Sequence, residues 1–476
     1  MVSCGAGVMG NHVLRLAAAA VAAVAAVVLV AARSAGASVP LHAVVRGGEI
    51  ADVDVVTKTG STHAAFASLS RTKLEPGDVT LRASVPGDRA AVEVPMCSHR
   101  GAVTVDGNRY APPPGPFVVR LATRAEPHTV AIELHVSEYE KRVACGDPIR
   151  AGAIVLARDG LVTLDFPSPP EDVARGGGRA VVYVPPNHDA RKPAALLVGV
   201  HPWNGDAWTY AAYAELLAAA RAHDVVLLMP SGLGNSLYTE HAENEVMRAI
   251  AAAERAVAID PARVSIWGAS MGGQGATTIG LHRPDHFAFI TSYFGDARFD
   301  LHSYVRSILP TEEAAHRVNP IDVIDNARHV PIWLIHGDAD RVSAVHESDE
   351  LAAALRKRGY DVRYDRPAGR GHEGLLVAEH VAEIVERASR ARVPDHPSRV
   401  TFRSVRPEDD RAYGVRLVRS GPNDAFVDIE ERGGRVIVHE TFGVRKILLE
   451  PGALGARHGE PIDFRRVSRG LEVRWE

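Results

Sequence analysis

The alternation of apolar and polar residues divides the chain into three parts. From about residue 41 to residue 150, short alternating runs are separated by turns rich in Pro and Gly, which is typical of an all-β domain. The same alternation returns past residue 397. We therefore expect a β-sandwich-like domain on each side of the middle part, over residues 38–165 and 397–476.

In the middle part, over residues 175–392, continuous apolar runs alternate with alanine-rich stretches of helical length. This rhythm predicts an α/β domain with a buried, mostly parallel sheet and helices on both faces. The expected strands are 180–184, 195–200, 225–229, 264–267, 287–293, 332–335 and 361–364. The expected helices are 207–222, 240–257, 270–281, 347–357 and 374–390.

A serine between glycines follows one of the apolar runs. The stretch Gly268-Ala269-Ser270-Met271-Gly272 comes directly after residues 264–267. A serine hydroxyl is a poor nucleophile, and a sharp strand-to-helix turn is one way to expose it to a base and a substrate. The glycines make room for such a turn. Ordinary strand-turn-helix packing also produces this motif, so its meaning depends on the motifs that come later in the chain.

Two further polar motifs are found in the order Asp, then His. The apolar run 331–335 ends in the stretch His336-Gly337-Asp338-Ala339-Asp340, and the pair Gly371-His372 comes later. Serine, acid and histidine in this order are expected of a nucleophile elbow whose acid and base lie in loops after strands.

These motifs together resemble the α/β-hydrolase superfamily. Within it, the chain is similar to secreted esterases of the polyhydroxybutyrate depolymerase and feruloyl esterase type, and to the catalytic domain of prolyl oligopeptidases (peptidase family S9). The resemblance covers about residues 178–391 and excludes the flanking β-rich domains. Besides the serine motif, it rests on residues 182–186, 201–205, 260–264, 336–342 and 371–372.

The resemblance implies a catalytic triad. Ser270 would attack an acyl carbon, His372 would take its proton, and Asp340 would orient the imidazole. Asp340 is preferred to Asp338 because, in the family, an Arg/Val step like Arg341-Val342 comes after the acid. Asp338 would then be a turn-forming carboxylate.

The resemblance also implies an oxyanion hole and a substrate site. One donor would be the backbone N–H of Met271, and the second that of Trp203, since Pro202 has no N–H and replaces the glycine usual in the family. His201 is expected to be structural. Aromatic residues near the carboxyl ends of strands are the candidates for substrate binding, although each could equally belong to the core. They are Trp208, Tyr238 and Tyr293.

The N-terminal residues and the cysteines indicate export. Residues 14–32 form an almost unbroken Ala/Val/Leu run, followed by small residues that end at Ala37. This pattern predicts a signal peptide over residues 1–37, and hence a secreted or periplasmic protein without stable membrane insertion. An uncleaved anchor is the alternative. Cleavage would leave only Cys97 and Cys145, which we expect to form a disulfide rather than two buried thiols.

Composition narrows the class of function. A net charge of −4 offers no basic field for nucleic acid, and the 22 histidines include no set at metal-ligand spacing, so no metal or other cofactor is expected. The sequence therefore predicts an exported serine hydrolase that cleaves small-molecule or polymeric carboxylic esters. Two alternatives remain, a serine peptidase of the prolyl oligopeptidase type and a non-catalytic protein that binds glycans or cell surfaces. The oligomeric state is left open.

Overall fold

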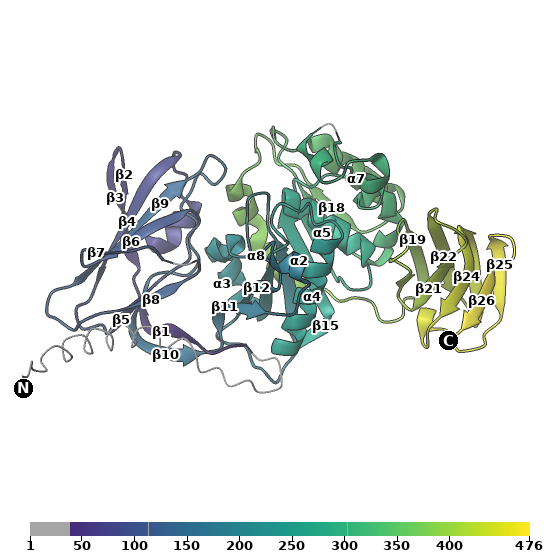
Figure 1. Cartoon of the computed structure of the whole chain (residues 1–476), viewed down its shortest axis with the longest axis horizontal. Helices are drawn as coiled ribbons and strands as arrows, with labels where there is room; N and C mark the ends of the chain where they lie inside the picture. The colour runs from purple at the N-terminus through teal and green to yellow at the C-terminus, as the bar shows by residue number, and fades with distance from the viewer. Residues whose placement is uncertain (1–38, 113, 302) are drawn as a thin grey trace, which may run out of the picture.

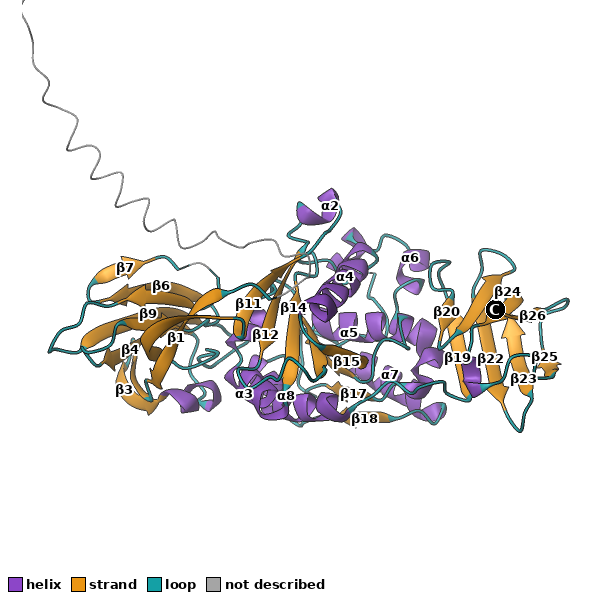
Figure 2. Ribbon diagram, turned by 90° about the horizontal axis from the view of Figure 1, so that it is seen from below, coloured by secondary structure: helices purple, strands orange, loops and turns teal. Residues whose placement is uncertain are grey.

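The computed structural model describes residues 39–112, 114–301 and 303–476. The predicted signal peptide over residues 1–37 therefore lies outside the described residues. An N-terminal β-rich region, a central α/β region and a C-terminal β-rich region succeed one another along the long axis of the molecule (Figures 1 and 2). Within the described ranges, no helix is long and apolar enough to cross a membrane.

The central region is built on one eight-stranded sheet with the order β11-β12-β14-β13-β15-β16-β17-β18. β11 and β12 pair in antiparallel fashion, as do β12 and β14, whereas every pair from β14/β13 to β17/β18 is parallel. The strands are β11 (Gly160–Asp165), β12 (Arg179–Val184), β13 (Ala194–Val200), β14 (Val225–Pro230), β15 (Ile259–Ala269), β16 (Ile290–Tyr293), β17 (Ile332–Ile335) and β18 (Val362–Asp365).

Helices cover both faces of this sheet because its strands are apolar on both sides. In β13, Leu196 and Val198 pack on one face, and Leu197 packs on the other. The first face carries α4 (His241–Ala256), α5 (Met271–His282) and α7 (Val345–Lys357). The second carries α3 (Ala214–His223) and α8 (Gly374–Arg390). The predicted α/β-hydrolase fold class is thus confirmed.

Some elements of the central region differ from the sequence-based expectation. β11 falls within residues 38–165, which we assigned to the N-terminal domain, yet it pairs with β12 at the edge of the central sheet. Its alternating pattern looks like that of the preceding β domain because an edge strand is only partly buried. Short helical turns, η3 (Tyr304–Ser307), α6 (Glu312–His316) and η4 (Pro320–His329), fill the segment between β16 and β17, where no element was expected.

The N-terminal region consists of two antiparallel sheets, with the orders β1-β10-β5-β8 and β3-β2-β4-β9-β6-β7. The strands are β1 (His42–Glu49), β2 (Asp52–Thr57), β3 (Gly60–Ala65), β4 (Gly77–Val85), β5 (Ala91–Val94), β6 (Arg100–Val105), β7 (Asn108–Tyr110), β8 (Phe117–Arg120), β9 (His128–Val136) and β10 (Arg150–Ala157). Inward-facing valines and leucines of both sheets form one core, as expected of a sandwich. The expected disulfide between Cys97 and Cys145 is present in that core.

The C-terminal region also has two sheets, with the orders β19-β22-β23-β25 and β20-β21-β24-β26. The strands are β19 (Arg399–Ser404), β20 (Arg411–Ala412), β21 (Val415–Arg419), β22 (Ala425–Glu431), β23 (Val436–Phe442), β24 (Val444–Leu449), β25 (Ile462–Arg466) and β26 (Glu472–Trp475). Both flanking regions are therefore β-rich, as predicted.

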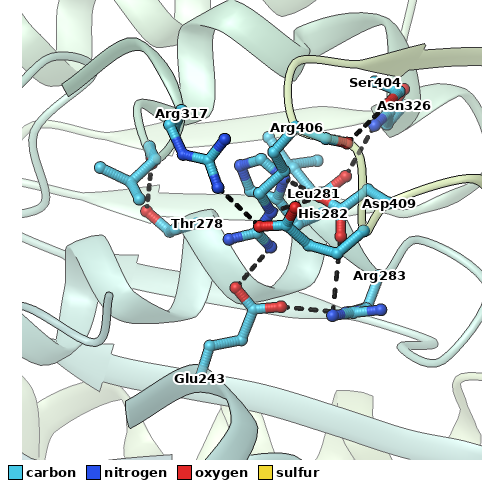
Figure 3. Close-up of polar contacts among 12 residues, drawn as sticks. Glu243, Thr278, Leu281, His282, Arg283, Arg317, Asn326, Ser404, Arg406 and Asp409 are labelled. Atoms are coloured by element: carbon cyan, nitrogen blue, oxygen red, sulfur yellow. Dashed lines mark hydrogen bonds and ion pairs between the residues drawn. The ribbon is translucent and has the colours of Figure 1, made fainter. Parts of the chain in front are cut away.

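Buried charges join the C-terminal region to the central one (Figure 3). Asp409, between β19 and β20, accepts hydrogen bonds from His282 Nδ1 at 2.6 Å and from Arg406 Nε at 2.6 Å. Arg406 also donates to Glu243 of α4 at 2.5 Å, and Arg283 donates to the same carboxylate at 2.9 Å. Burial alone raises the pKa of Asp409, but the hydrogen bond and charge of His282, together with Arg406, lower it to about 2.

We expect Asp409→Asn to lower the free energy of unfolding by about 3–5 kcal/mol, because it leaves Arg406 and His282 buried without their shared anion. The matched control is Glu408→Gln, which breaks an exposed pair with Arg317 and costs at most about 1 kcal/mol. Urea unfolding at neutral pH measures both. Since the pKa of Asp409 is lowered, the carboxylate's contribution is complete above pH 3.8, and it is lost as the pH falls through about 2. Equal effects of the two substitutions would contradict this role.

Removing the disulfide is expected to destabilise the N-terminal region. The bridge closes a loop with a sequence separation of 48 residues. Loop-closure entropy then gives a contribution of about 4 kcal/mol, which the double variant Cys97→Ser/Cys145→Ser should lose in a urea titration. Peptide mass spectrometry of unreduced protein is the direct measurement, and two free thiols would refute the bridge.

Candidate active site

Ser270 lies at a strained strand-to-helix turn. β15 ends at Ala269, α5 begins at Met271, and Ser270 between them has φ 58° and ψ −123°. Positive φ is unfavourable for a residue with a Cβ, so the surrounding backbone must hold this conformation. The Ser270 N–H donates to Tyr293 O of β16 at 2.9 Å, which fixes the turn against the neighbouring strand.

The glycines of the motif allow close contact between α5 and the sheet. A Cβ on Gly272 would lie 1.8 Å from Val200 O, and a Cβ on Gly268 would lie 2.4 Å from Gly272 O. No side chain larger than hydrogen fits at either position without moving the backbone. The sequence-based explanation of the glycines therefore agrees with the geometry of the turn.

His372, which is partly buried, pairs with Asp340, which is fully buried. His372 Nδ1 lies 2.8 Å from Asp340 Oδ2, and the Asp340 side chain is fully buried. Asp340 Oδ1 accepts from the N–H groups of Val342 at 2.7 Å and Ser343 at 3.0 Å. Burial raises the pKa of Asp340, but hydrogen bonds from His336, His372 and Val342 outweigh it and hold the pKa well below its usual range. The carboxylate is therefore ionised beside His372.

Asp338, the other candidate acid, has a different partner. Its Oδ1 accepts from the Gly369 N–H at 2.6 Å, which closes the loop that leads to His372. The structure thus brings Asp340 to His372 and leaves Asp338 as a turn-forming carboxylate.

Phe294 places the Ser270 turn and His372 in one neighbourhood. It comes directly after Tyr293, whose carbonyl holds the Ser270 amide, and its ring centroid lies 4.5 Å from that of His372. In the described part of the chain, no direct hydrogen bond between the Ser270 hydroxyl and His372 is found. Contacts of this kind are often long without substrate and tighten when it binds.

The loop after β13 lies against the first turn of α5. The position of a Gly272 Cβ would be 2.9 Å from His201 O, so residues 201–205 start beside the serine turn. This loop carries Trp203, the second candidate oxyanion donor, and the first candidate, Met271, opens α5. The His201 ring is buried between the carbonyl oxygens of Pro202 and Ser231, at 2.9 and 2.8 Å, as expected of a structural residue.

The proposed aromatic substrate residues need correction. Tyr238 and Tyr293 are fully buried, and their hydroxyls donate to His201 O at 3.2 Å and Val377 O at 3.1 Å. They belong to the core: the Tyr238 ring packs against Gly232 and Gly275, and the Tyr293 ring packs against Trp267 and Phe294. Trp208 lines a cavity of about 370 Å³ at the N-terminal region, and none of Ser270, Asp340 and His372 lines that cavity.

His336 is a neighbour of Asp340 that the sequence did not reveal. Its Nε2 lies 3.3 Å from Asp340 Oδ2, and its Nδ1 lies 2.8 Å from Ser348 Oγ, which in turn donates to Gly295 O at 3.1 Å. Asp340 therefore lies between two histidines. His336 and Asp340 lie only four residues apart, so the sequence contained a signal of this contact. Only the tertiary structure, however, shows that the His336 ring faces the carboxylate.

Comparisons with known proteins give one family match and a number of similar solved structures. Residues 234–389 match the model of the prolyl oligopeptidase family. No curated protein matches the chain. Similar solved structures include fluorophosphonate-binding serine hydrolase F of Staphylococcus aureus, at 15% identity over 48% of this chain and 98% of that one, with a TM-score of 0.40. An S-formylglutathione hydrolase from Agrobacterium tumefaciens has 17% identity over 49% and 95%, with a TM-score of 0.43.

Identities and TM-scores this low say nothing about what this chain acts on. The family match covers the serine turn, the Asp340 loop and His372 in one stretch. Together with the order and direction of the eight central strands, it identifies this protein as a serine hydrolase whose core has the α/β-hydrolase fold and resembles the prolyl oligopeptidase family.

Proposed function

We propose that this protein cleaves carboxylic ester bonds through an acyl-enzyme formed on Ser270. The observation that carries the proposal is the Asp340–His372 pair beside the strained serine turn. Asp340 fixes the imidazole with Nδ1 protonated, which leaves Nε2 free to act as a base.

The proposed reaction has two balanced steps. Ser270 Oγ attacks the ester carbonyl carbon while His372 Nε2 takes the hydroxyl proton. The tetrahedral intermediate collapses, and the leaving alcohol takes that proton from His372. Water then attacks the acyl carbon, again with His372 as base, so that the carboxylic acid leaves and the Ser270 hydroxyl is restored. The N–H groups of Met271 and Trp203 are the proposed donors to the oxyanion.

The architecture of the N-terminal region favours an esterase over a peptidase of the prolyl oligopeptidase type. Its ten strands form two packed antiparallel sheets rather than the repeated four-stranded blades of a propeller. A peptidase remains the second candidate because the matching family model is that of prolyl oligopeptidases. A non-catalytic binding protein is less favoured, since a decayed enzyme would be expected to have lost at least one of Ser270, Asp340 and His372, and the sequence carries all three in order.

Export of the protein is part of this proposal. A disulfide in the N-terminal region supports an oxidising compartment, because such bridges are rarely stable in a reducing cytosol. The substrate would then be a small-molecule or polymeric ester outside the cytoplasm.

Ser270→Ala is expected to lower kcat on p-nitrophenyl and feruloyl esters by a factor on the order of 10⁶, since it removes the nucleophile. The variant should also lose labelling by a fluorophosphonate. Ser389→Ala, near the end of α8, is the matched control and should behave like the wild type. Turnover retained in Ser270→Ala would exclude this residue as the nucleophile, and cleavage of proline-containing peptides alone would favour the peptidase.

Asp340→Asn is expected to reduce kcat by about 10⁴, because an amide at this position favours the wrong tautomer of His372. KM should change little. Asp338→Asn is the matched control, and it should cost only a modest factor through the Gly369 turn. Comparing kcat for the two purified variants tests the assignment, which is wrong if Asp338→Asn is the more damaged enzyme.

A further inference from the structure

The N-terminal region reaches the segment that carries His372. The loop between β9 and β10 includes Tyr139, whose carbonyl accepts the Gly374 N–H at 2.9 Å. Gly374 is two residues past His372 and is the first residue of α8. A backbone group from another part of the chain thus satisfies the first amide of this helix, and the preceding residue, Glu373, makes no side-chain cap.

The carboxylate of Glu140 lies directly against Gly374, the first residue of α8. A Cβ placed on Gly374 would be 2.6 Å from Glu140 Oε2 and 2.7 Å from Oε1, so the carboxylate touches the glycine backbone. An anion is favourable there, because the N-terminal end of a 17-residue helix carries partial positive charge. Glycine at 374 is what permits this approach.

Two groups hold the Glu140 carboxylate in place. The Tyr213 hydroxyl, from the central region, donates to Oε1 at 2.9 Å, and Arg142 Nε donates to Oε2 at 3.2 Å. Arg142 is itself buried, with its guanidinium 4.5 Å from the centre of the Tyr213 ring and Nη1 donating to Ser70 O at 2.9 Å. Burial, and then the charge of Glu140, raises the pKa of Tyr213 well above its usual value, so this hydroxyl remains a donor.

The disulfide anchors the same loop from the other side. Cys145 lies three residues after Arg142 and is bonded to Cys97. Hydrogen bonds flank the bridge, from Ser98 N to Ala144 O at 2.8 Å and from Gly146 N to Met96 O at 2.9 Å. The loop therefore meets α8 as a fixed part of the N-terminal region.

We propose that Glu140 and the Tyr139 carbonyl position the catalytic histidine by fixing the start of α8. This inference rests on the proposed role of His372 as the base. Asp340 fixes one end of the imidazole, and the N-terminal region fixes the backbone two residues beyond it. Glu140 is a positioning residue, since it acts through Gly374 and does not touch the reacting atoms. The N-terminal region is then required for turnover even if it binds no substrate.

The test compares Glu140→Ala, Glu140→Gln and Glu138→Ala in the full chain. Glu138 is an exposed carboxylate of the same loop and serves as the matched control. Glu140→Ala should lower kcat on a p-nitrophenyl ester about 10- to 100-fold, with KM nearly unchanged. The reason is that a displacement of a catalytic group such as His372 by about 1 Å can reduce the rate by a factor of this size. Glu140→Gln, which still accepts from Tyr213, should recover most of the loss. Glu138→Ala should match the wild type.

A further variant changes the central-region side of the contact between Glu140 and Gly374. Gly374→Ala introduces a methyl group that pushes the Glu140 carboxylate away, so its effect on kcat should largely disappear in the Glu140→Ala background. Non-additivity of this kind identifies a shared contact. If Glu140→Ala does not fold, Gly374→Ala is the deciding variant, and wild-type kcat in Gly374→Ala would overturn the inference.

Fluorophosphonate labelling separates this inference from the proposed function. A wild-type protein that labels at Ser270 but cleaves no ester contradicts the esterase proposal alone, and the labelling rate then replaces kcat in the comparison. Slower labelling of Glu140→Ala than of Glu138→Ala supports the positioning role in either case. Equal labelling rates and equal kcat values for Glu140→Ala and the wild type would refute it.

Discussion

The close approach of α5 to the central sheet is the constraint on which the candidate site depends. Gly272 lies so near Val200 O that no Cβ fits, and this contact forces the sharp turn that gives Ser270 its positive φ. The strain at Ser270 is maintained by surrounding structure, namely the Tyr293 carbonyl and the packed helix.

Each flanking β region contacts one end of a helix that begins next to a residue of the candidate site. The N-terminal region contacts Gly374 at the start of α8, just after His372, and the C-terminal region contacts His282 at the end of α5, the helix that begins after Ser270. Both attachments use a buried arginine, Arg142 in one and Arg406 in the other. Removing one partner of a buried pair leaves the other charge unpaired, so both attachments are sensitive to substitution.

Asp340 illustrates how burial and hydrogen bonding oppose one another. Removing a carboxylate from water raises its pKa, yet two backbone amides and two histidines reverse the effect and keep it charged. A charged acid beside the ring favours the tautomer of His372 that carries its proton on Nδ1. Asp338, two residues earlier, meets only a turn amide and has no such role.

The preference for Asp340 over Asp338 rests on the resemblance to a family, whereas local patterns in the sequence determined the central strands and helices and the glycines around Ser270. These features depend on residues close together in the chain, where periodicity and turn chemistry act directly. The burial of Tyr238 and Tyr293 could not be predicted from the sequence, because a position near the end of a strand does not reveal how deeply a ring is buried. Three other features depend on packing. They are the pairing of β11 with the central sheet, the contact of His336 with Asp340, and the approach of Glu140 to Gly374. Only the tertiary structure decided them, because such contacts depend on how whole elements pack and leave no periodic signal in the chain.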